Sequence, residues 1–142
     1  MGVLGTWPEH LDPVVKEFSE CFDSMERYEL LFQYAKCHPT PLPPDEWNDE
    51  NQVHGCQSRA HVICLVDDEG GFVLRGGADA QIVQGLMAVT AMAVNGMEPS
   101  KVAQMEPDYA EAMGIRSSLT PSRANGFLNM FRRVRKEAAM FV

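Results

Sequence analysis

"RAHVICLVDDEGGFVLRG", residues 59–76, is the stretch that decides the fold. Residues 59–67 are apolar at both alternating sets of positions, which is typical of a strand that is covered by packing on at least one face. The turn signal "DDEGG" at 67–71 follows, and "FVLRG" at 72–76 is typical of a returning strand. The stretch therefore predicts a β-hairpin, with which the segment before Gly55 can pair as a third strand.

Helical patterns lie on both sides of this hairpin. The main helices are expected from Asp12-Pro13, with Cys21 and Phe22 on its buried face; from Asp23, whose capping box includes Glu26; over about 80–95, capped by Asp79; and from Thr120-Pro121 nearly to the end of the chain. Short helices are expected around 99–105 and 107–113, and an ordered surface connection over 39–51. The fold class is α+β: a small antiparallel sheet of about three strands packed against helices, in one domain over 1–142.

Composition places the chain among soluble globular proteins. It has 142 residues, of which 45% are hydrophobic and 23% charged. No apolar run approaches the roughly 20 residues that cross a bilayer, and the first residues show no secretory signal. We therefore expect no membrane association, and a location in a cytoplasm or in the interior of an organelle such as a plastid.

The charge is acidic overall and uneven along the chain. The net charge of −8 argues against nucleic-acid binding as the main role. From Arg116 to the end there are six basic residues and one acidic residue, so residues 1–115 carry −13. The basic end predicts either a solvated helix face paired with the acidic body or a docking surface for a partner.

Among the four cysteines, Cys56 is the candidate with a chemical role. The wide spacing of the cysteines favours free thiols in a reducing compartment. Gly55 immediately precedes Cys56 and lets the backbone turn sharply, which can lift the thiol to a loop tip. A thiolate there is a strong nucleophile, although a cysteine packed like an alanine in a turn fits the spacing equally well.

Two further kinds of site are conceivable around Cys56. His54, Cys56, His61 and Cys64 lie within eleven residues, but they form no C-x-x-C pair, and one strand over 59–67 sends His61 and Cys64 to opposite faces. No metal site is therefore predicted. A cysteine hydrolase that uses one of the histidines is the other kind, but no triad order can be recognised in the sequence.

Arg123 is locally unusual. It falls in the first turn of the last helix, where the helix dipole disfavours a cation. Such departures from a local rule are often functional. An exposed arginine that bends back to a carboxylate explains the position equally well. If Arg123 lies near Cys56, its charge stabilises a thiolate or a persulfide anion.

Three separated motifs resemble the SufE family of sulfur-acceptor proteins. They are "HGCQS" at 54–58, "GGADAQIVQGLMAV" at 76–89 and "LTPSRANGF" at 119–127, in this order and with a hairpin after the first. The resemblance covers about residues 24–140. It implies the fold shared by SufE and the IscU scaffold, with the cysteine of the first motif on a loop at the edge of the sheet.

The resemblance also implies a function. A SufE protein receives sulfane sulfur as a persulfide from a SufS-type cysteine desulfurase, activates that enzyme, and passes the sulfur on toward an iron–sulfur scaffold. The desulfurase carries pyridoxal phosphate (PLP), whereas no cofactor is expected here. The chain would then be a sulfur-transfer partner rather than a stand-alone enzyme.

Individual residues carry over from the family motifs. Cys56 corresponds to the persulfide carrier, and Asp79 and Arg123 to neighbours that shape the site or the docking surface. The loop of the carrier would include Gly55, Gln57 and Ser58. His54 departs from the usual pattern, and a part in deprotonating the thiol is open.

Two other functions stay open on the sequence. An IscU-like scaffold for a cluster or for zinc would need at least three ligands near Cys56, and metal analysis tests for it. A non-catalytic binding module would activate a desulfurase by contact alone, and a Cys56→Ser variant that still stimulates the partner would support it.

Overall fold

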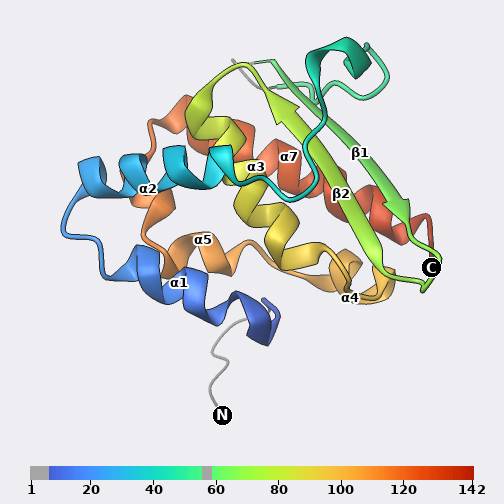
Figure 1. Cartoon of the computed structure of the whole chain (residues 1–142), viewed down its shortest axis with the longest axis horizontal. Coiled ribbons are helices and arrows are strands. Elements are labelled where there is room, and N and C mark those ends of the chain that lie inside the picture. The colour runs from blue at the N-terminus through green and yellow to red at the C-terminus, as the bar shows by residue number, and fades with distance from the viewer. Residues whose placement is uncertain (1–6, 56–58) are drawn as a thin grey trace.

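A β-hairpin lies across two long helices in the computed structural model, which describes residues 7–55 and 59–142 (Figure 1). Strands β1, Ala60–Val66, and β2, Phe72–Ala78, pair antiparallel, with Ala60 opposite Ala78. Among the described residues the expected third strand is reduced to an isolated antiparallel bridge between Gln52 and His61. The α+β class with helices on one face of the sheet is confirmed.

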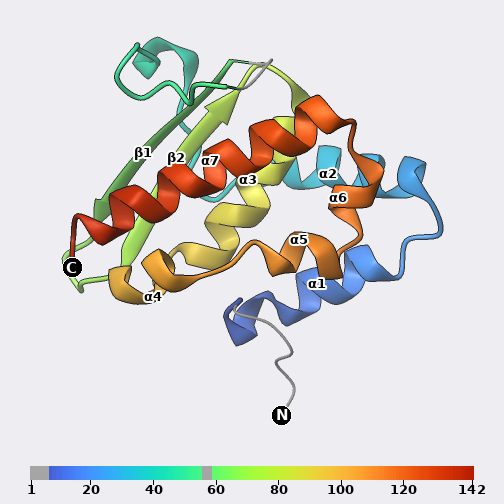
Figure 2. The same ribbon diagram turned by 180° about the vertical axis from the view of Figure 1, so that it is seen from behind.

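Helices α3 and α7 lie behind the hairpin, and α1, α2 and α5 lie to one side of it (Figures 1 and 2). Seen from behind, α7 runs along the hairpin, and contacts join α7 to β1 and α3 to β2 (Figure 2). The helices are α1 Asp12–Ser19, α2 Ser24–Lys36, α3 Gln81–Val94, α4 Pro99–Gln104, α5 Asp108–Ala112, α6 Ile115–Ser118 and α7 Pro121–Ala139, with short 3-10 turns at Glu9–Leu11 and Pro44–Glu46. No helix in the described part of the chain is long and apolar enough to cross a bilayer.

The last helix follows its expected start and its expected apolar face. The Thr120 hydroxyl accepts a hydrogen bond from the Arg123 backbone N at 3.3 Å, as an N-cap should. The face of α7 that meets the sheet and α5 is at most 3% exposed: Phe127, Met130, Phe131, Val134 and Ala138. The rings of Phe127 and Phe131 pack against Tyr109, which closes the core on the α5 side.

The prediction for the first helix was wrong beyond Ser19. Helix α1 ends there, the Phe22 side chain is 88% exposed, and Cys21 is only half-buried. The capping box of α2 explains the early end. Asp23 Oδ1 accepts a hydrogen bond from the Glu26 N, and the Glu26 carboxylate accepts one from the Phe22 N. The chain must leave the first helix to make these bonds, which turns Phe22 away from the core.

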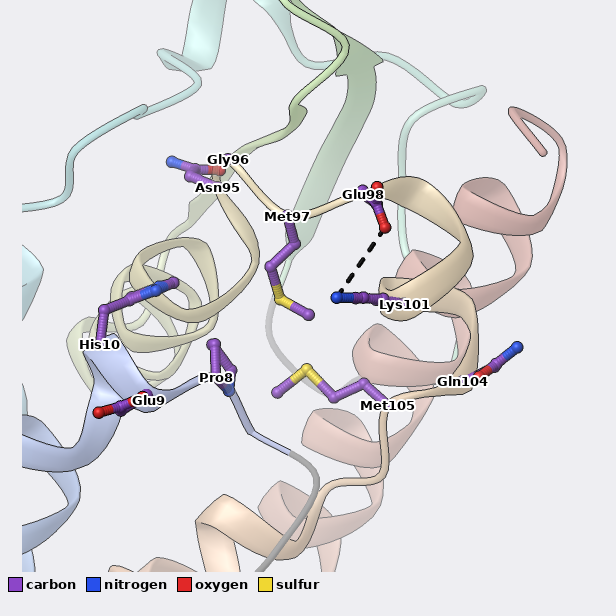
Figure 3. A pocket seen from close by; sticks show the side chains of 10 residues that line it. All are labelled: Pro8, Glu9, His10, Asn95, Gly96, Met97, Glu98, Lys101, Gln104 and Met105. Atoms are coloured by element: carbon purple, nitrogen blue, oxygen red, sulfur yellow. Dashed lines mark ion pairs between the residues drawn. The ribbon is translucent and has the colours of Figure 1, made fainter. Parts of the chain in front are cut away.

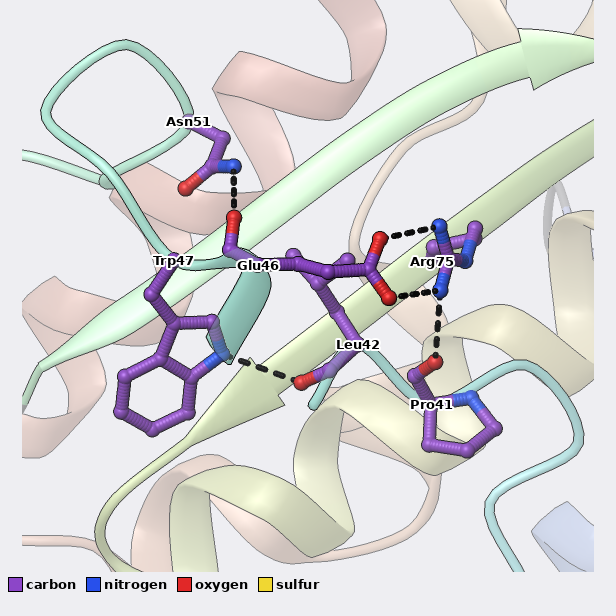
Figure 4. A network of polar contacts seen from close by, with 6 residues as sticks. All are labelled: Pro41, Leu42, Glu46, Trp47, Asn51 and Arg75. Carbon is purple, nitrogen blue, oxygen red and sulfur yellow. Dashed lines mark hydrogen bonds and ion pairs between the residues drawn. The ribbon is translucent and has the colours of Figure 1, made fainter. Parts of the chain in front are cut away.

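The connection over 39–51 is ordered and covers the outer face of the hairpin. Arg75 of β2 donates hydrogen bonds to both carboxylate oxygens of Glu46, and the Trp47 indole donates to the Leu42 carbonyl oxygen (Figure 4). The Trp47 ring stacks on His61, with ring centroids 4.7 Å apart. Helices therefore cover one face of the sheet, and this connection covers the other.

His38 makes the stability of the fold depend on pH. Its Nδ1 accepts a hydrogen bond from the Thr40 backbone N at 3.1 Å, so the neutral ring carries its proton on Nε2. That atom is buried and has no hydrogen-bond partner among residues 7–55 and 59–142. Burial lowers the pKa of His38 from 6.5 to about 4. The folded protein is therefore destabilised when His38 must be protonated. The stability associated with the neutral ring is complete above a pH of 6.5 and is lost as the pH falls toward 4.

We expect His38→Asn to weaken this pH dependence, because Oδ1 of asparagine can accept the same hydrogen bond and does not titrate. The measurement is the free energy of unfolding in urea for both proteins at about pH 7 and about pH 5. The wild type should lose more stability than the variant over this interval. Equal losses would show that His38 is not the titrating group.

Candidate functional site

The candidate carrier residue lies between two well-described flanks. Cys56, Gln57 and Ser58 lie outside the described residues. The chain before them ends at Gly55 and resumes at Arg59, immediately ahead of β1. The site is therefore described through its two flanks, Gly55 and Arg59, and through the residues that hold them.

Helix α7 holds the first flank. Asn129 Nδ2 donates a hydrogen bond of 3.0 Å to the carbonyl oxygen of Gly55, which is 74 positions earlier in the chain. Gly55 has a φ of +85°, a conformation that favours glycine. A Cβ atom at this position would overlap Asn129 Nδ2, so a larger residue here would require the Asn129 amide to move.

Asp79 holds the second flank. Its Oδ1 accepts a hydrogen bond from the Arg59 N, and its own N donates to the Arg59 carbonyl oxygen, both at 3.0 Å. The expected role of Asp79 as the cap of α3 is thus wrong, because the N-cap is Ala80 and makes no side-chain capping bond. The carboxylate instead closes the open end of the hairpin, directly beside the carrier segment.

Arg133 ties the segment before the carrier to α7. Its Nη1 donates to the Gln52 carbonyl oxygen at 2.9 Å, and its Nη2 donates to the Glu50 carbonyl oxygen at 2.7 Å. Its Nε forms an ion pair with Glu137 one turn further along the helix. The roles of Arg133 and Asn129 were not anticipated from the sequence. The one available signal was that Asn129 lies inside a helix, where asparagine is unfavourable.

The remaining expected site residues lie in different settings. His54 is exposed next to Gly55. Arg123 is half-buried in the first turn of α7, as expected, and its Nη1 is buried without a hydrogen-bond partner in the part of the chain that the structure describes. Within that part, the hydrogen bonds of the flanks join Gly55 to Asn129 and Arg59 to Asp79, and none involves Arg123.

The other cysteines differ sharply from one another in exposure. Cys64 lies on the helix-facing side of β1 and is 8% exposed, and burial together with the nearby Glu137 charge raises the pKa of its thiol. Cys37, at the end of α2, is exposed, and Cys21 is half-buried. A thiol with a raised pKa in an apolar environment is a poor nucleophile, which removes Cys64 as a candidate carrier.

We expect iodoacetamide at about pH 8 to alkylate Cys37 in the native protein while Cys64 stays unmodified. Cys64 should react only after denaturation, because burial both blocks the reagent and keeps the thiol protonated. Peptide mass spectrometry of native and unfolded samples measures both sites. Alkylation of Cys64 at the rate of Cys37 in the native protein would contradict the burial of its thiol.

No metal cluster marks the described flanks of the carrier segment. Over residues 7–55 and 59–142, no group of three or more His, Cys, Asp or Glu side chains could hold a metal ion. A pocket of about 760 Å³ lies between the Pro8 segment and α4, where Met97 and Met105 point inward and Lys101 pairs with Glu98 (Figure 3). Its lining residues include none of the flank residues.

Comparison with known proteins gives one family. The family model described as "SufE: Fe-S metabolism associated domain" matches residues 12–138. The chain is 37% identical over 136 residues to an uncharacterised SufE-like protein of Synechocystis sp., which covers 96% of this chain and 84% of that protein.

Two further similarities bear on length and fold. The chain is 34% identical over 131 residues to the Arabidopsis thaliana SufE-like protein 1, chloroplastic/mitochondrial; this covers 92% of the chain but 35% of that protein, so the chain spans about a third of it. The solution structure of a hypothetical protein from Thermus thermophilus superposes with a TM-score of 0.77 at 23% identity, over 94% of this chain and 96% of that one. This last similarity shows the fold alone.

Proposed function

The chain belongs to the SufE family, whose domain is associated with Fe–S metabolism, and from that premise we propose that it carries sulfane sulfur on Cys56. The sulfur comes from a SufS-type cysteine desulfurase and continues toward an iron–sulfur scaffold. The chain also activates the desulfurase, because removal of the sulfur frees the donor cysteine for the next turnover. In this proposal PLP belongs to the partner, and no cofactor is assigned to this chain.

One observation supports Cys56 most directly: both ends of its segment are held by long-range hydrogen bonds. Asn129 holds the Gly55 carbonyl, and Asp79 holds Arg59. The residues on either side of the Cys56 segment are therefore fixed at the edge of the sheet. Sulfur transfer between two proteins needs such a placement, because the two sulfur atoms must meet in line.

The proposed step is a thiol–persulfide exchange. The Cys56 thiolate attacks the terminal sulfur of the donor's persulfide, Cys–S–SH. A new S–S bond forms on Cys56, the donor's S–S bond breaks, and its electron pair leaves with the donor's cysteine as a thiolate. The products are Cys56–S–SH and a donor thiolate, so the reaction requires neither an oxidant nor a reductant.

Neighbouring residues have supporting roles in this proposal. Arg123 is proposed to stabilise the Cys56 thiolate and the persulfide anion, since its buried Nη1 has no partner among the described residues. Asp79 positions the end of the carrier segment through Arg59. Gly55, Gln57 and Ser58 are assigned to the carrier loop from the family motif. His54 is exposed next to Gly55, and a part in deprotonating the Cys56 thiol is proposed for it only as an open possibility of the sequence.

The proposed setting is a reducing compartment, either a cytoplasm or the interior of an organelle. Free thiols suit such a compartment, and Cys37, which is exposed, is a free cysteine. In this compartment the complex with the partner would protect the transferred sulfur from reductants, because the sulfur passes directly from one protein to the other.

Mass spectrometry after incubation with a SufS-type desulfurase, PLP and cysteine, without reductant, tests this function. We expect one added sulfur atom on the peptide that contains Cys56, and none on that peptide in Cys56→Ser. Circular dichroism should show that the serine variant folds like the wild type. Absence of added sulfur on the wild type would overturn the carrier role, and full stimulation of the desulfurase by Cys56→Ser would show a binding module instead.

A further inference from the structure

A groove runs along the exposed side of α7, directly beside the carrier segment. Its volume is about 590 Å³. One wall contains Glu50, Val53 and His54, and the other contains α7 residues from Asn129 to Glu137 and Met140 just after the helix. Asn129 is both a lining residue of this groove and the holder of the Gly55 carbonyl. One end of the groove therefore lies next to Gly55, the last described residue before Cys56.

The groove is preformed. Arg133 holds the wall formed by residues 50–54 through its bonds to the Gln52 and Glu50 carbonyl oxygens, across 81 and 83 positions of the chain. The ion pair between Arg133 and Glu137 fixes the guanidinium on the helix. A partner that enters the groove consequently does not have to order it, which reduces the entropic cost of binding.

The groove carries unneutralised positive charge. Arg132 and Lys136 are exposed, one turn apart, and in residues 7–55 and 59–142 no ion pair engages either of them. Arg133 and Glu137 neutralise one another, and Glu50 adds one exposed carboxylate on the opposite wall, so the ionised lining residues sum to +1. Met140, 76% exposed, supplies the accessible apolar surface of the groove, whereas Val53 lines it but is only 3% exposed.

This local charge contrasts with the rest of the protein. Residues 1–115 carry −13, so the surface as a whole repels an anionic polymer such as a nucleic acid or an anionic membrane. A short acidic segment of a protein contacts only the groove, so two adjacent cations beside a small apolar surface are sufficient to bind it. The charge pattern thus favours a protein partner over a phosphate-bearing one.

We propose that this groove is the docking site of the sulfur donor, and that it binds an acidic segment of that protein bearing an apolar side chain. The inference rests on the proposed carrier function, because continuity of the groove with Gly55 then brings the donor's persulfide to Cys56. The donor's carboxylates pair with Arg132 and Lys136, and its apolar side chain packs on the exposed Met140. Docking there orients the donor before the sulfur atoms meet.

Charge reversal tests the docking site. The variants are Lys136→Glu, Arg132→Glu and the double variant, with Lys16→Glu/Lys36→Glu as the matched control. The control makes the same change in net charge at exposed residues of α1 and α2. Arg132 Nη1 donates a hydrogen bond of 3.3 Å to Asn129 Oδ1, so Arg132→Glu also disturbs the residue that holds Gly55. Lys136 lies one turn further along α7, so Lys136→Glu is the more informative single change.

Sulfur uptake is measured with two donors, the desulfurase and a small persulfide such as glutathione persulfide. For the double variant we expect kcat/KM with the protein donor to fall at least about tenfold more than the rate with the small donor, chiefly through KM. The loss should shrink as salt is added, because exposed charge pairs are screened. The control variant should keep wild-type kinetics with both donors, and thermal unfolding checks that all variants fold.

The outcomes separate the docking site from the carrier function. Wild-type kinetics of the double variant with the desulfurase would overturn the docking site and leave the carrier role intact. If the wild type accepts no sulfur at all, the carrier role fails, and calorimetric binding of the desulfurase to each variant then decides the docking site alone. A third outcome would also overturn the docking site. In it, the wild type binds anionic vesicles in a salt-sensitive manner, the double variant loses this binding, and binding of the desulfurase is unchanged.

Discussion

Replacement of Gly55 by alanine is expected to lower the rate of sulfur uptake on Cys56 by about tenfold or more, because it displaces the first flank of the carrier segment. The added Cβ would overlap Asn129 Nδ2, and the amide must move away. Movement of Asn129 breaks its hydrogen bond to the Gly55 carbonyl, the contact that fixes this end of the segment. The backbone at +85° is in addition strained by any Cβ, by roughly 1–2 kcal/mol.

Gly70→Ala separates these two causes. Gly70, in the hairpin turn, has a φ of +84° and no atom within 4 Å of an added Cβ. Both variants should therefore lose about 1–2 kcal/mol of stability from the backbone conformation, and only Gly55→Ala should also lose sulfur uptake. The measurements are urea unfolding and the rate of persulfide formation with the desulfurase. Equal uptake by the two variants would show that the Asn129 contact does not position the carrier.

Replacement of Gly85 by alanine is expected to lower the free energy of unfolding by about 2 kcal/mol, although helix propensity alone favours alanine by about 1 kcal/mol. Gly85 lies in α3 where this helix crosses α2. An added Cβ would overlap the Leu31 carbonyl oxygen and approach Leu31 Cβ to 3.0 Å. The opposing atoms belong to the α2 backbone or lie next to it, so no side-chain rotation relieves the contact and the helices must separate.

The series Gly85→Ala and Gly85→Val measures this close approach by urea unfolding, and the valine variant should lose more stability because it adds more volume. Chemical shifts of α2 and α3 should change in both variants, while the Thr120 cap of α7 should not. A gain in stability for Gly85→Ala would show that propensity outweighs packing and that the two helices can separate at little cost.

Local features of the fold followed from the sequence. The hairpin, the caps at Asp23 and Thr120, and the buried face of α7 were all anticipated, because each depends on residues a few positions apart or on a simple repeat. The family resemblance over about 24–140 was also sound, and the family match, over residues 12–138, begins twelve residues earlier. For the candidate site, the sequence alone singled out Cys56 with its preceding glycine, and that assignment stays a prediction.

Only the tertiary structure decided what surrounds the carrier segment. Asn129 and Arg133 reach residues 74 to 83 positions away, and Asp79 bonds to Arg59 across the mouth of the hairpin instead of capping α3. Phe22 likewise turned outward because the α2 cap ended the first helix. Local hydrogen bonds depend on sequence spacing, whereas these contacts exist only after α7 has packed against β1 and the hairpin has closed.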